Sequence, residues 1–292
     1  MRIALFSTGF SEELEPLYIE LLGRLRYKNF DIYIYEPFYR KLLENRLIGE
    51  EIQPFVNHDD INGKIDFLFS LGGDGTFLKT LSLIKDSGIP VLGFNTGRLG
   101  FLSDISRDEI SEALECLKEK QYHIEKRSLI RLNKPENLFG DNNYALNEIT
   151  VHKRDSSSMI TIQAYVNDVF LNSYWADGLI VSTPTGSTAY SMSCGGPIMA
   201  PDANNFILTP IATHTLTVRP VVIPDSAVVK LKVEGRMDNF LVTLDSNNAV
   251  INSSIELEIR KEDFCINFVQ LNTHSFFSTI REKLMWGWDK RN

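Results

Sequence analysis

A carboxylate lies among three glycines at residues 71–76, which read Leu-Gly-Gly-Asp-Gly-Thr. The segment follows an apolar run at 65–70 and precedes a helical pattern that begins at Phe77, so it marks a strand-to-helix turn. Glycines there allow a phosphate chain to approach the backbone, and the N–H groups of the starting helix favour an anion. Asp74 would repel phosphate unless it holds a metal ion or accepts a proton. The alternative is an ordinary Asp-Gly turn.

Two later segments are also rich in groups that bind ligands. Residues 177–197 are crowded with hydroxyls, small residues and glycines, and they include one tyrosine, Tyr190. Composition alone would make this a Ser/Thr/Gly loop in a β-rich region. Asn147 and Glu148 are adjacent in a β-like run, where neighbouring side chains point to opposite faces unless a bulge intervenes. By itself this pair is uninformative.

Taken together, the segments resemble the NAD kinase family in their order and spacing. The matches are the glycine loop at 72–76, the Asn147-Glu148 pair, the long motif around 183–190, and a further loop at 93–102. The long motif is far more specific than the glycine loop. The resemblance extends through nearly the whole chain, although the first 60 residues and the C-terminal tail carry little of it.

The resemblance implies transfer of the terminal phosphoryl group of ATP to the 2′-hydroxyl of the adenosine ribose of NAD, giving NADP and ADP. Such a transfer needs in-line positioning and charge neutralisation by a divalent metal ion, here expected to be Mg²⁺. Asp74 is the candidate that orients or deprotonates the hydroxyl, and a helix start favours its ionised form. Lys79, about one turn further along, is a candidate phosphate ligand or else a solvated surface lysine. The expected phosphate and ATP contacts are Gly72, Gly73, Gly75, Thr76 and Lys79.

The resemblance also implies a set of NAD contacts. They are Asp74, Gly75, Phe101, Asn147, Glu148, Asp177, Thr188, Ala189, Tyr190, Ser191, Met192, Ser193, Ala212 and Asn247. A carboxylate at Glu148 would accept hydrogen bonds from two ribose hydroxyls, and the Asn147 amide would both donate and accept. Phe101 walls the adenine pocket or belongs to the core, and Asp177 is a further acceptor or part of a turn.

Composition narrows the function class. The chain has 292 residues, is 43% hydrophobic and has a net charge of −8, which argues against broad binding of nucleic acid or anionic membranes. No apolar stretch approaches the roughly 18 residues that span a bilayer. Cys116, Cys194 and Cys265 are widely separated, which fits a reducing compartment better than a disulfide framework or structural zinc. We therefore expect a cytoplasmic protein that binds neither nucleic acid nor membrane.

The hydrophobic pattern changes near residue 125. Before it, helical and strand periods alternate, which predicts an open, mostly parallel α/β sheet over 1–125. In such sheets ligands bind beyond the carboxyl ends of the strands, where Asp74 and Asn95 would lie. Residues 126–275 read as an antiparallel, sandwich-like β domain, and 276–292 as a helix that returns to the first domain. The resemblance implies that the β domain binds NAD. The strands expected in the β domain are 129–132, 149–152, 160–166, 179–182, 216–218, 228–233, 240–244 and 255–259.

Other nucleotide-binding classes fit less well. Gly63-Lys64 is followed by Ile65, so there is no Walker A sequence, and Leu78 occupies the third glycine position of a Rossmann fingerprint. Two alternatives stay open: a lipid or sugar kinase that shares the Gly-Gly-Asp-Gly loop, and a non-catalytic NAD-sensing module. The resemblance further implies a homodimer or homotetramer with shared nucleotide pockets, in which Tyr190 lies at a subunit boundary. The alternative for Tyr190 is a half-buried residue of one subunit's own pocket.

Overall fold

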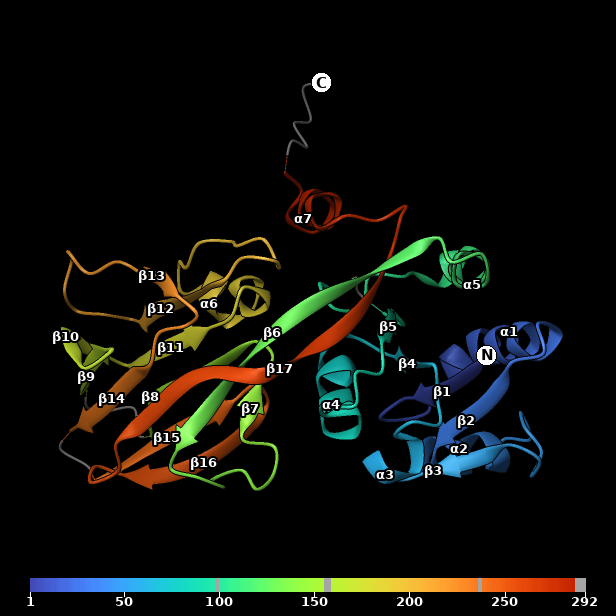
Figure 1. Cartoon of the computed structure of the whole chain (residues 1–292), viewed down its shortest axis with the longest axis horizontal. Helices are drawn as coiled ribbons and strands as arrows, with labels where there is room; N and C mark the ends of the chain where they lie inside the picture. The colour runs from blue at the N-terminus through green and yellow to red at the C-terminus, as the bar shows by residue number, and fades with distance from the viewer. Residues whose placement is uncertain (98–99, 155–158, 236–237, 287–292) are drawn as a thin grey trace. The chain divides into compact units, whose positions relative to one another are not determined.

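The computed structural model of the chain describes residues 1–97, 100–154, 159–235 and 238–286 (Figure 1). It divides into two compact units, of which unit 1 is Met1–Lys126 with Ile266–Asn292 and unit 2 is Arg127–Cys265. The chain passes from one unit to the other within two long strands, β6 (Tyr122–Lys134) and β17 (Leu257–Leu271). The domain ranges 1–125 and 126–275 stay predictions, and the second change of unit comes ten residues before the predicted one.

Unit 1 is built on a parallel sheet with strand order β3-β2-β1-β4-β5. The C-terminal part of β17 extends it in parallel, with Phe268 paired to Val91. Its strands are β1 (Arg2–Phe6), β2 (Asp31–Tyr35), β3 (Gln53–Phe55), β4 (Phe67–Leu71) and β5 (Val91–Phe94). Its helices are α1 (Glu15–Tyr27), α2 (Glu36–Glu44), α3 (His58–Ile61), α4 (Asp74–Ile84), α5 (Ile110–Lys118) and α7 (Phe276–Leu284), with 3-10 turns at Glu12–Leu14 and Arg107–Glu109.

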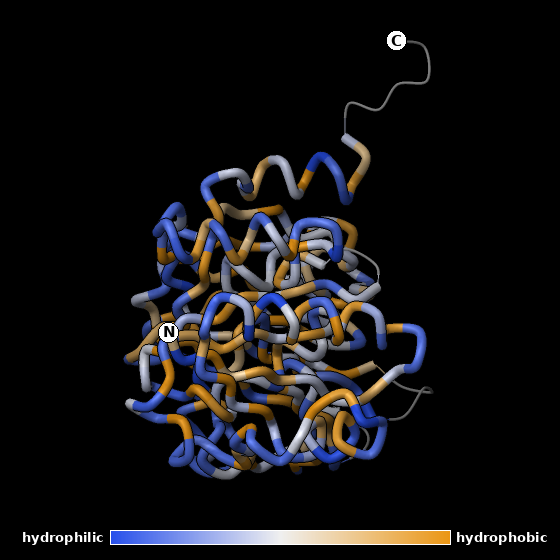
Figure 2. The backbone as a smooth tube through the Cα atoms, turned by 90° about the vertical axis from the view of Figure 1, so that its right-hand side faces the viewer, coloured by the Kyte–Doolittle hydropathy of each residue, from blue (hydrophilic) through white to orange (hydrophobic). Residues whose placement is uncertain are grey.

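Hydrophobic periodicity explains these elements. Every residue of β4 is buried, as expected of a central parallel strand that is covered on both faces. In α1 the buried side chains recur at helical spacing, at Leu17, Tyr18, Leu21, Leu22 and Leu25. Figure 2 shows the same contrast, since hydrophobic stretches run through the interior and hydrophilic ones lie mostly at the outside.

Unit 2 contains two antiparallel sheets that share one core. One has the order β10-β9-β14-β17, and the other β13-β12-β11-β8-β15-β16. Ile149 and Leu179 from one sheet join Ile162 and Leu231 from the other in a single hydrophobic cluster, which is the packing of a sandwich. The remaining bounds are β7 (Tyr144–Ala145), β8 (Glu148–Lys153), β9 (Ile160–Val166), β10 (Val169–Ala176), β11 (Gly178–Ser182), β12 (Asn205–Ile211), β13 (Val221–Pro224), β14 (Val229–Glu234), β15 (Asn239–Leu244), β16 (Asn247–Asn252), a 3-10 turn at Thr185–Thr188 and α6 (Tyr190–Ser193).

The predicted fold class is confirmed: an α/β unit with a mostly parallel sheet, an antiparallel β unit, and a C-terminal helix that belongs to the first. The strand predicted at 160–166 is β9. No helix of the described residues is long and apolar enough to cross a membrane.

The strand predicted at 216–218 is wrong. Val218 donates its N–H to the Thr215 carbonyl in a turn, and Leu216 is 89% exposed. The Arg219 guanidinium donates to the carbonyls of Leu216 and Val218, at 2.7 Å each, so these acceptors are occupied by a side chain instead of a sheet ladder. The strand follows later, as β13.

The C-terminal helix is also shorter than predicted. α7 ends at Leu284, because Met285 takes a left-handed conformation with φ of 54° and caps it. The predicted remainder of this helix, including Trp288, falls at 287–292, outside the described residues.

Candidate active site

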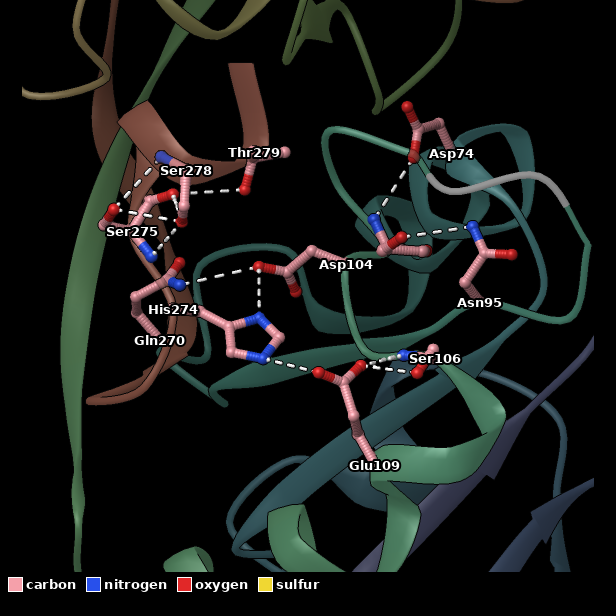
Figure 3. Close-up of polar contacts among 11 residues, drawn as sticks. Asp74, Asn95, Asp104, Ser106, Glu109, Gln270, His274, Ser275, Ser278 and Thr279 are labelled. Carbon is pink, nitrogen blue, oxygen red and sulfur yellow. Dashed lines mark hydrogen bonds and ion pairs between the residues drawn. The ribbon is translucent and has the colours of Figure 1, made fainter. Parts of the chain in front are cut away.

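Asp74 is the first residue of α4, and its carboxylate is held by backbone donors. Its oxygens accept the N–H groups of Phe101 (2.9 Å), Leu102 (3.0 Å) and Ser103 (3.1 Å). Figure 3 shows the carboxylate above this loop. Gly73, the N-cap residue, offers no side-chain cap, so the helix start keeps N–H groups that have no intrahelical partner. We call Asp74 with these three donors the Asp74 cradle.

Glycines around the cradle serve two different purposes. A Cβ atom at Gly100 would overlap Oδ1 of Asp74, so only glycine lets the loop approach the carboxylate. A Cβ at Gly72 would overlap the Thr76 hydroxyl. At Gly73 and Gly75, by contrast, a Cβ would meet no protein atom within 4 Å. Packing of this chain does not require glycine at those two positions, which leaves their backbone open to a ligand.

Asn95, directly after β5, fixes the loop that supplies the donors. Its side-chain amide donates to the Ser103 carbonyl (3.2 Å), and its oxygen accepts the Gly97 N–H (2.7 Å). Figure 3 shows the first of these bonds. Asp74 and Asn95 follow neighbouring parallel strands, as the rule for ligand sites in open sheets predicts.

The two other residues predicted on α4 differ in surroundings. The Thr76 hydroxyl lies 3.5 Å from the Thr8 hydroxyl, whereas Lys79 is exposed and makes no ion pair with any described residue. Thr8 also lines a cavity of about 460 Å³ in unit 1. The cavity is bordered by Thr8, Gly9, Phe10, Glu12, Pro37, Lys41, Glu44 and Asn45.

A cation that sequence analysis missed lies beside the cradle. Lys283, near the end of α7, is half-buried, and its Nζ is 4.1 Å from the centroid of the Phe101 ring. Burial lowers the pKa of Lys283, while the charges of Asp74 and Asp104 act to raise it. No motif marks this lysine, because only the fold brings α7 to residues so far back in the chain.

A histidine between two carboxylates holds the start of α7. His274 Nε2 lies 3.0 Å from a Glu109 oxygen, and Nδ1 lies 3.5 Å from Asp104 (Figure 3). The hydrogen bond with Asp104 raises the pKa of His274 to about 9, so the ring is positively charged at neutral pH. The adjacent Ser275 and Ser278 form a capping box that begins the helix.

Unit 2 contains a second carboxylate held by three backbone donors. Asp245 accepts the N–H groups of Leu146 (2.8 Å), Asn147 (2.8 Å) and Glu148 (3.1 Å). We call this the Asp245 cradle. Burial of the carboxyl group raises the pKa of Asp245 to about 6, and the three N–H bonds limit the rise. Sequence analysis missed Asp245, since nothing in its Asp-Ser-Asn context distinguishes it from a turn.

Asn147 and Glu148, which the Asp245 cradle holds through their backbone, have side-chain polar groups without partners in the described residues. Burial, and then the charge of Asp245, raises the pKa of Glu148 to about 8, although the Tyr190 N–H acts in the opposite direction. Burial thus favours the protonated form of this carboxyl group, whereas the sequence led us to expect a carboxylate. Its buried Oε2 has no hydrogen-bond partner in the described chain, and the Asn147 side chain also makes no hydrogen bond there.

The first half of the long motif packs on this pair. Thr183 donates its N–H to the Asn147 carbonyl (2.9 Å) and its hydroxyl to the Leu146 carbonyl (2.5 Å). A Cβ at Gly186 would overlap the Asn147 backbone, so glycine is required for this approach. The long motif and Asp245 thus both hold the backbone of the Asn147-Glu148 segment.

The second half of the motif brings several predicted NAD contacts together. Burial raises the pKa of Tyr190, and nearby Cys194, Asp177 and Glu148 add to the rise. Asp177 pairs with the Lys153 ammonium at 2.6 Å. Within unit 2, Glu148, Asp177 and Tyr190 are therefore neighbours.

The other predicted contacts vary in accessibility. Asp177 donates its N–H to the Ile211 carbonyl, next to Ala212, which is exposed and has a left-handed φ of 46°. The Ser191 hydroxyl is buried against Thr209 at 2.8 Å, so it is already used inside the protein. Half-buried or exposed positions are occupied by Thr188, Ala189, Met192, Ser193 and Asn247.

In the described residues no group of three His, Cys, Asp or Glu side chains could hold a metal ion. Asp74 is the carboxylate that lies nearest to the open glycines in sequence.

Comparisons with known proteins agree with this arrangement. Residues 41–122 match the family model of the ATP-NAD kinase N-terminal domain, and residues 146–271 match that of the ATP-NAD kinase C-terminal domain. The NAD kinases of Flavobacterium psychrophilum and Cytophaga hutchinsonii are each 47% identical to this chain, with 100% of both chains covered in each comparison.

Two solved structures have a similar fold. A yeast NADH kinase complexed with NADH aligns with a TM-score of 0.85 at 23% identity, over 99% of this chain and 89% of that one. An NAD kinase from Archaeoglobus fulgidus in complex with ATP aligns with a TM-score of 0.75 at 25% identity, over 98% of this chain and 99% of that one. The chain is 47% identical to bacterial NAD kinases over its full length and matches the models of both domains, so this chain belongs to the NAD kinase family.

Proposed function

We propose that the chain is an ATP-dependent NAD kinase, which transfers the terminal phosphoryl group of ATP to the 2′-hydroxyl of the adenosine ribose of NAD. The observation that carries the proposal is the Asp74 cradle beside Gly73 and Gly75. The backbone at these glycines is open, and packing within the chain does not explain why they are glycines. The relatives support it because they are named NAD kinases. The Archaeoglobus fulgidus kinase, which was solved with ATP, supports ATP as the donor.

Asp74 orients the attacking hydroxyl and accepts its proton. Three N–H groups hold the carboxylate in one orientation, two of them on Oδ1 and one on Oδ2, so Oδ2 keeps a lone pair for a further partner. A fixed acceptor saves the entropy of aligning the hydroxyl with the phosphorus atom. The phosphates of the substrates lie against the open backbone of the loop, where the dipole of α4 favours negative charge.

NAD is bound by the polar groups that unit 2 leaves unpaired. The Asn147 amide and Glu148 Oε2 are the groups for ribose hydroxyls or the base edge, since each lacks a partner in the described residues. Asp177, near Tyr190, adds a charged acceptor. Lys283 covers one face of the Phe101 ring, so a contact of Phe101 with NAD would use the opposite face or the edge.

Mg²⁺ enters with the donor nucleotide. Magnesium in kinases is commonly held by one or two carboxylates together with substrate phosphates, which is compatible with a chain that lacks a three-ligand cluster among its described residues. The ion would be held by the substrate phosphates and water, and it would neutralise charge on the transferring phosphoryl group.

The test is direct. Purified protein is incubated with ATP, Mg²⁺ and NAD, and NADP is measured with an NADP-specific dehydrogenase. We expect NADP to accumulate in step with ADP. ATP hydrolysis without NADP, or no reaction with a folded protein, would contradict the proposal.

The assembly is a homo-oligomer in the cytoplasm, in which Tyr190 of one subunit completes the pocket of another. Tyr190 is 42% exposed, and tyrosine is enriched at interfaces because it combines an apolar face with a polar tip. Mixing Tyr190→Ala subunits with Asp74→Asn subunits should restore part of the activity, since some mixed pairs contain one intact pocket. A fully active monomer in sedimentation at assay concentration would rule out the shared pocket.

A further inference from the structure

Lys283 has an unusual environment for a lysine. Its ammonium lies over the Phe101 ring at 4.1 Å from the centroid. The backbone N–H of Phe101 donates to the Asp74 carboxylate. Phe101 is thus a direct link between the lysine and the Asp74 cradle. Within the described residues, Nζ makes no ion pair within 4.0 Å and no hydrogen bond.

The two carboxylates whose charges act on Lys283, Asp74 and Asp104, already accept hydrogen bonds from other donors. Asp74 accepts three backbone N–H groups, and Asp104 accepts from His274 and, at 3.5 Å, from Gln270. Their charges stabilise the ammonium from a distance. A half-buried cation that contacts only an aromatic ring retains hydrogen-bond donors, which a ligand anion can use in place of water.

The neighbouring backbone suggests which anion this is. Gly73 and Gly75 leave the start of α4 open, and Asp74 by itself would repel phosphate. Lys79, the cation expected from sequence for this task, is exposed on α4. Lys283 is a cation in contact with the residue that holds Asp74, so it can offset the charge of this carboxylate when phosphate approaches.

We propose that Lys283, carried by the C-terminal helix, binds a substrate phosphate group beside the Asp74 cradle. The inference rests on the proposed function, because the phosphate belongs either to the triphosphate of ATP or to the diphosphate of NAD. It makes α7 part of the nucleotide site, although the helix lies far from every motif in sequence.

The experiment compares three variants of the full chain. Lys283→Met removes the charge and keeps the length of the side chain, and Lys283→Arg keeps the charge. Arg281→Met is the matched control, since it removes one positive charge from an exposed position of the same helix. Thermal unfolding of each unliganded variant establishes that it is folded.

The readouts are the dissociation constants of ATP and of NAD, measured separately by calorimetry. A charge-assisted hydrogen bond predicts that Lys283→Met weakens one of the two by roughly 10- to 100-fold, whereas Lys283→Arg and Arg281→Met stay within a few-fold of the parent. Weakened ATP binding assigns the triphosphate, and weakened NAD binding assigns the diphosphate.

Two results would overturn the proposal. One is unchanged affinity of Lys283→Met for both nucleotides. The other is equal damage from Lys283→Met and Lys283→Arg, which would mean that the side chain acts through packing on Phe101 and not through its charge. Failure of the proposed function is seen separately, because it removes NADP formation from the parent protein itself.

Discussion

Two carboxylates in different units are held by the same device. Asp74 accepts three consecutive backbone N–H groups from Phe101–Ser103, and Asp245 accepts three from Leu146–Glu148. Each cradle also requires a glycine, Gly100 in one case and Gly186 in the other, because a side chain there would overlap the cradle. Hydrogen-bond geometry alone would assign them the same role.

Their surroundings separate them. Near Asp74 lie open glycines and the cation Lys283, so this carboxylate lies where a ligand can reach it and close to a positive charge. Near Asp245 lies Glu148, whose pKa is raised by burial and then by the negative charge of Asp245. Three N–H donors position a carboxylate in both cases, whereas the neighbouring charges and its accessibility to a ligand determine its role. Asp74 is positioned for chemistry, and Asp245 positions the segment that binds NAD.

The largest effect should come from Asp74→Asn. The variant keeps the shape of the side chain but loses its charge and basicity, and loss of a general base typically lowers turnover by roughly 10²- to 10⁴-fold. NAD affinity should change little. Steady-state kinetics and NAD binding on the folded variant test this, and near-normal turnover would remove Asp74 from the mechanism.

Asp245→Asn should act on stability instead. The amide group brings N–H donors toward backbone N–H groups, and lost charge-assisted bonds cost about 1.5–3 kcal/mol each. Denaturant unfolding should therefore show a loss of that order, and NAD binding should weaken because Asn147 and Glu148 are displaced. A variant with unchanged unfolding but abolished turnover would contradict the structural role given to Asp245.

The pH dependence of NAD binding tests the role given to Glu148. Ribose hydroxyls that donate to Glu148 favour its ionised form and lower its pKa in the complex, so NAD affinity should rise with pH until the free protein's pKa of about 8 is passed. The expected gain between pH 6.5 and 9 is at most tens-fold, and ATP binding should not follow it. Glu148→Gln is the control, since it has no charge to gain. Identical pH profiles for the parent and Glu148→Gln would show that the assignment is wrong.

The smallest effect concerns His274, which holds the start of α7 near the Asp74 cradle. Its pKa is raised from 6.5 to about 9 by Asp104, and Glu109 adds to the rise, so its contribution to stability is complete below pH 6.5 and is lost as pH increases to 9. His274→Gln should remove this part of the pH dependence of the free energy of unfolding. Equal curves for the two proteins between pH 6 and 9.5 would exclude the ion pairs as a stabilising contact.

Local patterns predicted much of the fold. The apolar run at 65–70 predicted the strand that the structure shows as β4, and the alternation of helical and strand patterns before residue 125 predicted the α/β unit. The error at 216–218 arose where a side chain, Arg219, takes the backbone carbonyls that a strand would use. The sequence analysis missed β12. Its side chains are buried on both faces of the sheet and it contains a proline, so it shows no alternation of apolar and polar residues.

The family, the strand-to-helix turn that carries Asp74 and the Asn147-Glu148 pair can all be recognised without a structure, because they depend on residues that are adjacent in the chain. Folding is needed to show that Asp245 holds this pair, that Gly100 admits the loop to Asp74, and that Lys283 covers Phe101. It also decided the protonation of Glu148. Burial and the approach of a second charge set a pKa, and both come from segments that meet only when the chain has folded.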